Sequence, residues 1–165
     1  GAIGEPRMEG IDDLMATSYC KKLAKMAEAE FDSFSGYHET TPKMAARIKT
    51  YWSGLGLAFP GVGTAWSAVF VSFFVKSAGA TSSEFTFSSA HSQFVFDAIS
   101  NTGKLSEAFW GRPINQYAPK IGDLIQNNRN GNSFDFAHAA ANKKYESHSS
   151  IVVEEGIDGN GRYVR

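Results

Sequence analysis

The chain has 165 residues, 42% of them hydrophobic, and a formal net charge of −1. This length and composition fit one globular domain that buries its own core, so the sequence requires no second domain. The balanced charge gives no electrostatic footprint for nucleic acid, and no apolar run is long enough to cross a bilayer. A single cysteine, Cys20, excludes an internal disulfide and a zinc–cysteine cluster.

The first part of the chain, about residues 10–60, is predicted to be helical. Residues 11–31 carry apolar side chains at a helical period, with lysines and glutamates between them. Thr41 and Pro42 form a favourable N-cap and first-position pair for a second helix that runs to Trp52. Glycines and a proline then predict a flexible loop over residues 54–63.

A third helix is predicted to start near Ser67 and to lie at the centre of the domain. Thr64 is the expected N-cap, and Gly79 is expected to end the helix. The residues between them are apolar on nearly all sides, which is typical of a buried helix. Beyond it, residues 85–87 are expected to be extended, and Ser88 or Ser89 to cap a helix over residues 90–101.

The rest of the chain, from about residue 121, is predicted to form antiparallel strands. Residues 121–125 and 148–153 are rich in β-branched and other strand-forming residues, and residues 158–161 have the composition of a hairpin turn. Helices followed by strands is the order of an α+β fold, with a core over about residues 61–165.

Ser67 is a candidate nucleophile, because helix N-termini favour developing negative charge. A serine hydroxyl is weakly nucleophilic until a base removes its proton, so it needs an imidazole within hydrogen-bond reach. His148, at the exposed start of a predicted strand, is the expected base. On spacing alone, an ordinary helical serine and a polar residue at a strand edge explain the same pattern.

Three segments that include these residues resemble a known superfamily. Residues 66–71, 122–124 and 148–153 are similar, in the same order, to the signature segments of the NlpC and CHAP superfamily of papain-like amidases and peptidases. More narrowly, residues 47–153 resemble the bacterial domain-of-unknown-function family 2272. The resemblance implies a papain-like domain in which a central nucleophile helix packs on an antiparallel sheet, with a helical N-terminal part.

The sequence departs from the superfamily at the nucleophile, where Ser67 stands in place of the usual cysteine. A native serine and a cysteine replaced by serine both fit this position. The superfamily usually adds a third polar residue that orients the histidine, on the strand after the histidine strand. That strand is expected to start near Tyr163, so the orienting group is expected beyond Arg165 or is absent.

Other residues of this region have two interpretations each. By resemblance, His91 is a substrate contact or an alternative base, although a surface position at a helix start is equally consistent with its sequence. Tyr51 and Trp66 flank the nucleophile region and either wall a substrate groove or pack in the core. Cys20 is interpreted as a buried structural thiol in the middle of a helix, and Asp123 as part of a turn at a strand entry.

The resemblance implies a hydrolase that cleaves amide bonds of peptidoglycan, as an endopeptidase or amidase. It places the enzyme in the periplasm or outside the cell, as a secreted antibacterial effector or a lysin, with an immunity protein as partner if it is a toxin. No cofactor is expected, and the four histidines lack the ligand spacing of a metal site. The alternatives are an acyl or ester hydrolase of the same fold and a non-catalytic peptidoglycan-binding module.

Overall fold

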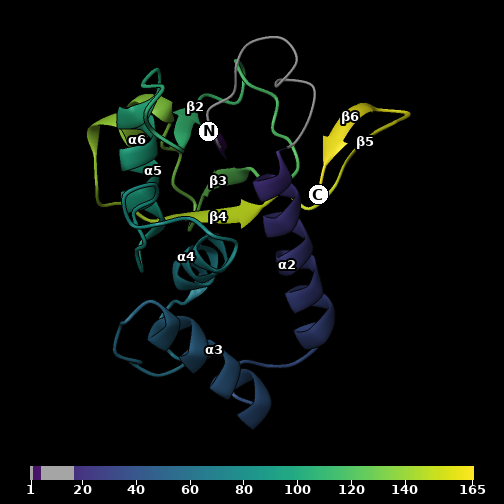
Figure 1. Cartoon of the computed structure of the whole chain (residues 1–165), viewed down its shortest axis with the longest axis vertical. Helices are drawn as coiled ribbons and strands as arrows, with labels where there is room; N and C mark the ends of the chain where they lie inside the picture. Colours follow the sequence, from purple (N-terminus) through teal and green to yellow (C-terminus); the bar gives the residue numbers. More distant parts are fainter. Residues whose placement is uncertain (1, 5–16) are drawn as a thin grey trace.

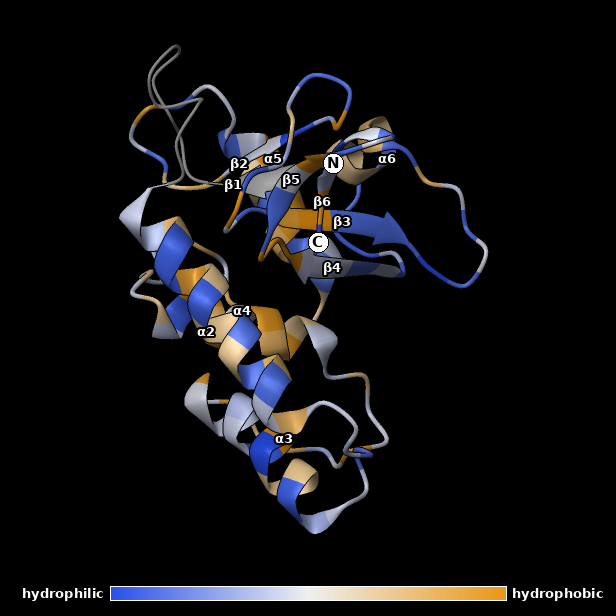
Figure 2. Ribbon diagram, turned by 90° about the vertical axis from the view of Figure 1, so that its right-hand side faces the viewer, coloured by the Kyte–Doolittle hydropathy of each residue, from blue (hydrophilic) through white to orange (hydrophobic). Residues whose placement is uncertain are grey.

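Helix α4 (Ser67–Ser77) is the central helix of the structure, a computed structural model that describes residues 2–4 and 17–165. It lies between strand β4 (Ser147–Ile151) and helix α3 (Pro42–Gly54), and it also contacts helix α2 (Ser18–Phe34) (Figure 1). Figure 2 shows α4 mostly in hydrophobic colours, whereas α2 and α3 carry polar residues as well. A helix that is apolar on most sides must be enclosed by other elements, which explains this arrangement.

A four-stranded antiparallel sheet packs against this helical part. Its strand order is β2-β1-β3-β4, in which β1 is Ala2–Gly4, β2 is Trp110–Arg112 and β3 is Leu124–Asn128. Strand β4 is the neighbour of α4, and Asn127 of β3 pairs with His148 of β4. The remaining elements are helices α5 (His91–Asn101) and α6 (Phe136–Ala141) and a hairpin of β5 (Glu155–Asp158) with β6 (Gly161–Val164).

Several sequence expectations are confirmed by these elements. The fold is α+β, helix α3 begins at Pro42 after the N-cap Thr41, and the hairpin turn lies at residues 158–161. Helix α4 ends just before Gly79, whose φ is +123°. The predicted helix over residues 11–31 corresponds to α2 from Ser18 onward, and its residues 11–16 lie outside the described part of the chain.

Other expectations were wrong in detail. The N-cap of α4 is Trp66 rather than Thr64, and the N-cap of α5 is Ala90 rather than Ser88 or Ser89. Residues 85–87, expected to be extended, belong to no helix and no strand of a sheet, which is compatible with that expectation. Phe85 is buried and contacts the rings of Phe94 and Phe109. No helix within residues 2–4 and 17–165 is both long enough and apolar enough to cross a membrane.

The motif residues Gly122 and Asp123 form the turn that leads into β3. Buried Asp123 accepts hydrogen bonds from the Tyr117 hydroxyl and the Lys120 amide. Gly122 has a φ of +85°, and a Cβ added to it would lie 2.4 Å from the Cα and the carbonyl oxygen of Cys20. The interpretation of this segment as a turn at a strand entry is consistent with these contacts.

Replacing Gly122 by alanine should therefore destabilise the domain strongly. The left-handed conformation costs a residue with a Cβ about 1–2 kcal/mol, and the clash with the Cys20 backbone adds to it, so we expect a total of about 3 kcal/mol. Urea denaturation measures this loss. Gly159→Ala is the matched control, because an added Cβ there meets nothing within 4 Å. Similar stabilities for the two variants would contradict the close approach of Gly122 to α2.

Candidate functional site

Ser67 is the first residue of α4, and its hydroxyl is hydrogen-bonded to a histidine. The distance from Ser67 Oγ to His91 Nε2 is 2.6 Å. His91 is the first residue of α5, so the N-terminal ends of two helices meet at this pair. The first N–H groups of α4 have no intrahelical acceptors, and they add a favourable field for negative charge beside the serine.

The position of His91 depends on a buried connection between α4 and the segment before α5. The Ser72 hydroxyl donates to the carbonyl oxygen of Ser88 and accepts from the Ser88 amide, both at 3.0 Å. Ser88 Oγ in turn accepts from the Ala90 amide at 3.0 Å. His91 follows directly and is only 6% exposed. The interpretation of His91 as a surface residue is therefore wrong, and its Nε2 lies within hydrogen-bond distance of Ser67.

His148, the base expected from the sequence, lies next to His91 rather than in hydrogen-bond contact with Ser67. The two imidazole rings are 5.2 Å apart between centroids and nearly perpendicular. His148 is half-buried on β4 and lines the same cavity as Ser67. The sequence predicted a hydrogen bond from Ser67 to His148, whereas the structure has this bond with His91 and places His148 in the lining that also includes Ser67.

Both histidines are neutral at neutral pH. The pKa of His91 is lowered to about 3, chiefly by burial and to a smaller extent by the positive charges that His148, when protonated, and Arg129 carry. The pKa of His148 is also lowered, first by burial and then by Arg129. His91 Nδ1 is buried and has no hydrogen-bond partner among the described residues, so no orienting carboxylate is present there. A neutral His91 with an unprotonated Nε2 can accept the serine proton.

Two cavities of different polarity meet at Ser67. The larger has a volume of about 670 Å³ and a mainly apolar lining that includes Phe31, Phe34, Met44, Trp66, Phe70, Val71, His148 and Ile151. The smaller has a volume of about 260 Å³ and a more polar lining that includes Ser89, His91, Arg129, Asn130, Tyr145, Glu146 and Ser147. Ser67 therefore lies at the border of two chemically distinct cavities.

The aromatic residues proposed as a groove wall differ in their exposure. Trp66 is half-buried and lines the larger cavity, and its Nε1 donates to Glu39 at 2.8 Å. Tyr51 is fully buried beneath it, with the two rings stacked at 6.1 Å. The Tyr51 hydroxyl donates to buried Glu30 at 2.5 Å, and Arg47 pairs with the same carboxylate. Tyr51 therefore supports Trp66 from beneath, and it also belongs to the lining of the larger cavity.

The remaining candidate residues lie outside this cluster. Cys20 is buried, as expected, but it lies in the first turn of α2 rather than in the middle of a helix, because α2 begins at Ser18. Cys20 lines neither cavity at Ser67. Within residues 2–4 and 17–165, no group of three or more His, Cys, Asp or Glu side chains could hold a metal ion.

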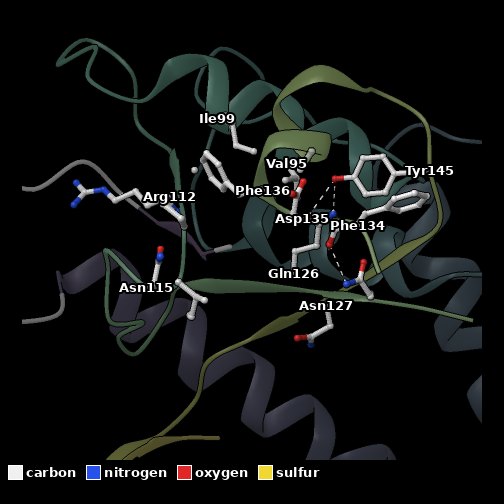
Figure 3. Close-up of a pocket in the computed structure, with 15 residues that line it drawn as sticks. Val95, Ile99, Arg112, Asn115, Gln126, Asn127, Phe134, Asp135, Phe136 and Tyr145 are labelled. Carbon is white, nitrogen blue, oxygen red and sulfur yellow. Dashed lines mark hydrogen bonds between the residues drawn. The ribbon is translucent and has the colours of Figure 1, made fainter. Parts of the chain in front are cut away.

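A third cavity lies on the other side of β3, bordered by α5, α6 and β2. Its volume is about 350 Å³, and neither Ser67 nor His91 lines it. Figure 3 shows Gln126 and Tyr145 pointing toward each other in it, where the Gln126 amide nitrogen donates to the Tyr145 hydroxyl at 3.0 Å. Tyr145 also lines the smaller cavity at the serine, so its side chain separates the two spaces.

The fold and the site define an α+β domain with a serine–histidine pair where two helices start. Comparison with known protein families matches residues 26–164 to DUF2272, described as "Uncharacterized protein conserved in bacteria". The chain belongs to this bacterial family, as its resemblance to family 2272 predicted. No curated protein and no solved structure gave a significant match.

Acidification is expected to destabilise the domain through His91. An unfolded histidine binds a proton near pH 6.5, whereas in the folded protein the pKa of His91 is lowered to about 3. Unfolding therefore takes up a proton between these values, and the free energy of unfolding falls as the pH decreases through this window. Urea denaturation at a series of pH values should show this fall and a shallower one in His91→Gln. Equal pH slopes would contradict a buried neutral imidazole.

Proposed function

We propose that this protein is a hydrolase in which Ser67 is the nucleophile and His91 its base. The observation that carries the proposal is the 2.6 Å contact between Ser67 Oγ and His91 Nε2. As Ser67 attacks a carbonyl carbon, its proton passes to His91, and the N–H groups at the start of α4 stabilise the oxyanion. The protonated His91 then gives this proton to the leaving nitrogen or oxygen, and water hydrolyses the acyl-enzyme by the reverse sequence.

His148 has a different role in this proposal from the one predicted from the sequence. It lines the larger cavity beside Ser67, with its ring against that of His91. From there it contacts the substrate and limits the movement of the His91 ring. The pair is unusual for a catalytic site, because a second imidazole rather than a carboxylate neighbours the base. A neutral neighbour stabilises the imidazolium less than an ionised carboxylate does.

The substrate proposed is an amide bond in the peptide part of peptidoglycan. The support is the resemblance of residues 66–71, 122–124 and 148–153 to NlpC and CHAP enzymes. A nucleophile helix packed on an antiparallel sheet, after helices α2 and α3, is consistent with a papain-like domain. The enzyme would then act in the periplasm or outside the cell, and an immunity protein would be its partner if it is a toxin.

The larger cavity favours a second candidate function, the hydrolysis of acyl esters. Its lining includes Phe31, Phe34 and Phe70, which suit an acyl chain better than a polar peptide. A serine nucleophile suits esters at least as well as amides. A series of p-nitrophenyl esters of increasing chain length tests this candidate, which requires turnover that rises with chain length and disappears in Ser67→Ala.

Incubation with purified peptidoglycan and analysis of the released fragments tests the main proposal. Ser67→Ala should lower the rate by at least about 1,000-fold, and His91→Ala by at least about 100-fold, because general-base catalysis contributes roughly that much. His148→Ala should cost less, because His148 does not bond to the nucleophile. His138→Ala is the matched control, since His138 is a half-buried histidine that lines neither cavity at Ser67. Equal cleavage by Ser67→Ala would end the proposal.

Ser67→Cys tests whether serine is the native nucleophile. A thiol at a helix N-terminus has a lowered pKa, so iodoacetamide should alkylate it readily near neutral pH, and more slowly in a variant that also carries His91→Ala. Buried Cys20 should label little in the parent protein. If serine replaces a native cysteine, the cysteine variant should cleave peptidoglycan faster by orders of magnitude. If serine is native, turnover should fall.

Slow alkylation that does not depend on His91, together with no cleavage by either protein, would contradict both catalytic proposals. Peptidoglycan binding without cleavage would then identify a binding module.

A further inference from the structure

The smaller cavity at Ser67 has a cation in its lining. Arg129 follows the last residue of β3 and lies on this lining with Ser67 and His91. Its charge is close enough to lower the pKa of both His91 and His148. Arg129 therefore lies within electrostatic reach of the reacting atoms, on the side of Ser67 that the apolar cavity does not occupy.

The turn that carries Arg129 is fixed by several hydrogen bonds. The Arg129 amide donates to the Asn132 side chain at 3.1 Å, and Asn130 has a left-handed φ of +54°. The side chains of Asn130 and Asn132 both donate to Glu146, to its carboxylate at 3.0 Å and to its carbonyl oxygen at 2.8 Å. Glu146 directly precedes β4, so this turn is attached to the strand that carries His148.

The guanidinium of Arg129 has no carboxylate partner within the described part of the chain. Arg47, Arg162 and Arg165 each pair with a glutamate, and Arg112 packs on two aromatic rings. The nearest acidic residue of the lining, Glu146, already accepts from the Asn130 amide. The charged or titratable groups on this side of the serine are thus Arg129, Glu146, Tyr145 and His91, with His148 behind His91.

We infer that the smaller cavity binds a carboxylate of the substrate, through Arg129. The planar guanidinium matches a carboxylate in two parallel hydrogen bonds, and the neighbouring hydroxyls of Ser89 and Ser147 and the amide of Asn130 suit a polar backbone. The substrate class is then a peptide with a free carboxylate next to the bond that Ser67 attacks. This inference rests on the proposed function, because it orients the substrate across the same serine.

Substrate binding would then also activate the base. A base whose pKa is far below the working pH accepts a proton poorly in the transition state. Pairing Arg129 with a carboxylate offsets the positive charge that opposes protonation of His91 and His148, so the pKa of each should rise when the substrate is bound. An uncharged substrate would leave both imidazoles in their weakly basic state.

Isothermal titration of Ser67→Ala with two synthetic peptides tests the inference. The peptides are L-Ala-γ-D-Glu-L-Lys with a free α-carboxylate on the glutamyl residue and the same peptide with an α-carboxamide there. We expect the carboxylate peptide to bind at least about 10-fold more tightly, because hydrogen bonds between a guanidinium and a carboxylate are stronger than those to a neutral amide. Adding Arg129→Gln should remove this preference, and Arg129→Lys should retain part of it. Arg162→Gln, on the β5–β6 hairpin, is the matched control.

Equal binding of the two peptides, no binding of either, or a carboxylate preference that survives Arg129→Gln would overturn the inference. Thermal unfolding of each variant confirms that it is folded. If the parent protein cleaves peptidoglycan but Ser67→Ala shows no carboxylate preference, the carboxylate subsite is contradicted and the hydrolase proposal is supported. If Ser67→Ala binds the carboxylate peptide selectively but the parent protein cleaves nothing, the carboxylate subsite is supported and the hydrolase proposal is contradicted.

Discussion

The site depends on the pair of hydrogen bonds between Ser72 and Ser88. A hydroxyl with no exposed surface, inside an otherwise apolar helix, must find partners within the protein, and here it finds both backbone groups of one residue. This contact fixes the segment before α5 against α4. As a result, His91 meets Ser67 although the two residues are 24 positions apart. A buried polar residue thus specifies the arrangement that the surrounding phenylalanines alone would leave variable.

The environment of the serine–histidine pair is asymmetric. On one side lies an apolar cavity with His148 at its wall, and on the other a polar cavity with Arg129. Burial and nearby positive charge both oppose protonation of the imidazoles, and among the described residues no carboxylate is hydrogen-bonded to His91 to offset them. A site of this kind has little basicity in the empty protein. In the proposed hydrolase, the basicity of His91 would then depend on the charge that the substrate brings, unlike that of a triad with a built-in carboxylate.

How much of this structure the sequence predicts depends on how local the determining interactions are. Local signals indicated the start of α3 at Pro42, the apolar character of α4 and the hairpin at residues 158–161 correctly. Strands β1 and β2 have three residues each and exist only through pairing with distant segments, so no periodicity identifies them. The exchange of His148 for His91 at the serine has the same origin, because the Ser72–Ser88 contact has no signature in the sequence. The one available hint was Ser72 itself, a polar residue among apolar neighbours, and this hint does not identify its partner.

The contacts that hold Trp66 in place determine where the chain can be shortened. Trp66 immediately precedes the serine, and it is held by Glu39 through its indole N–H and by Tyr51 through ring stacking. The Tyr51 hydroxyl is itself hydrogen-bonded to Glu30 on α2. All three supporting residues precede residue 60, where the sequence suggests that the catalytic core starts. A fragment cut at that point would retain Ser67, His91 and His148 but lose the supports of the residue before the nucleophile. For the proposed hydrolase, the N-terminal helices would therefore belong to the smallest active unit, and minimised variants should be shortened elsewhere.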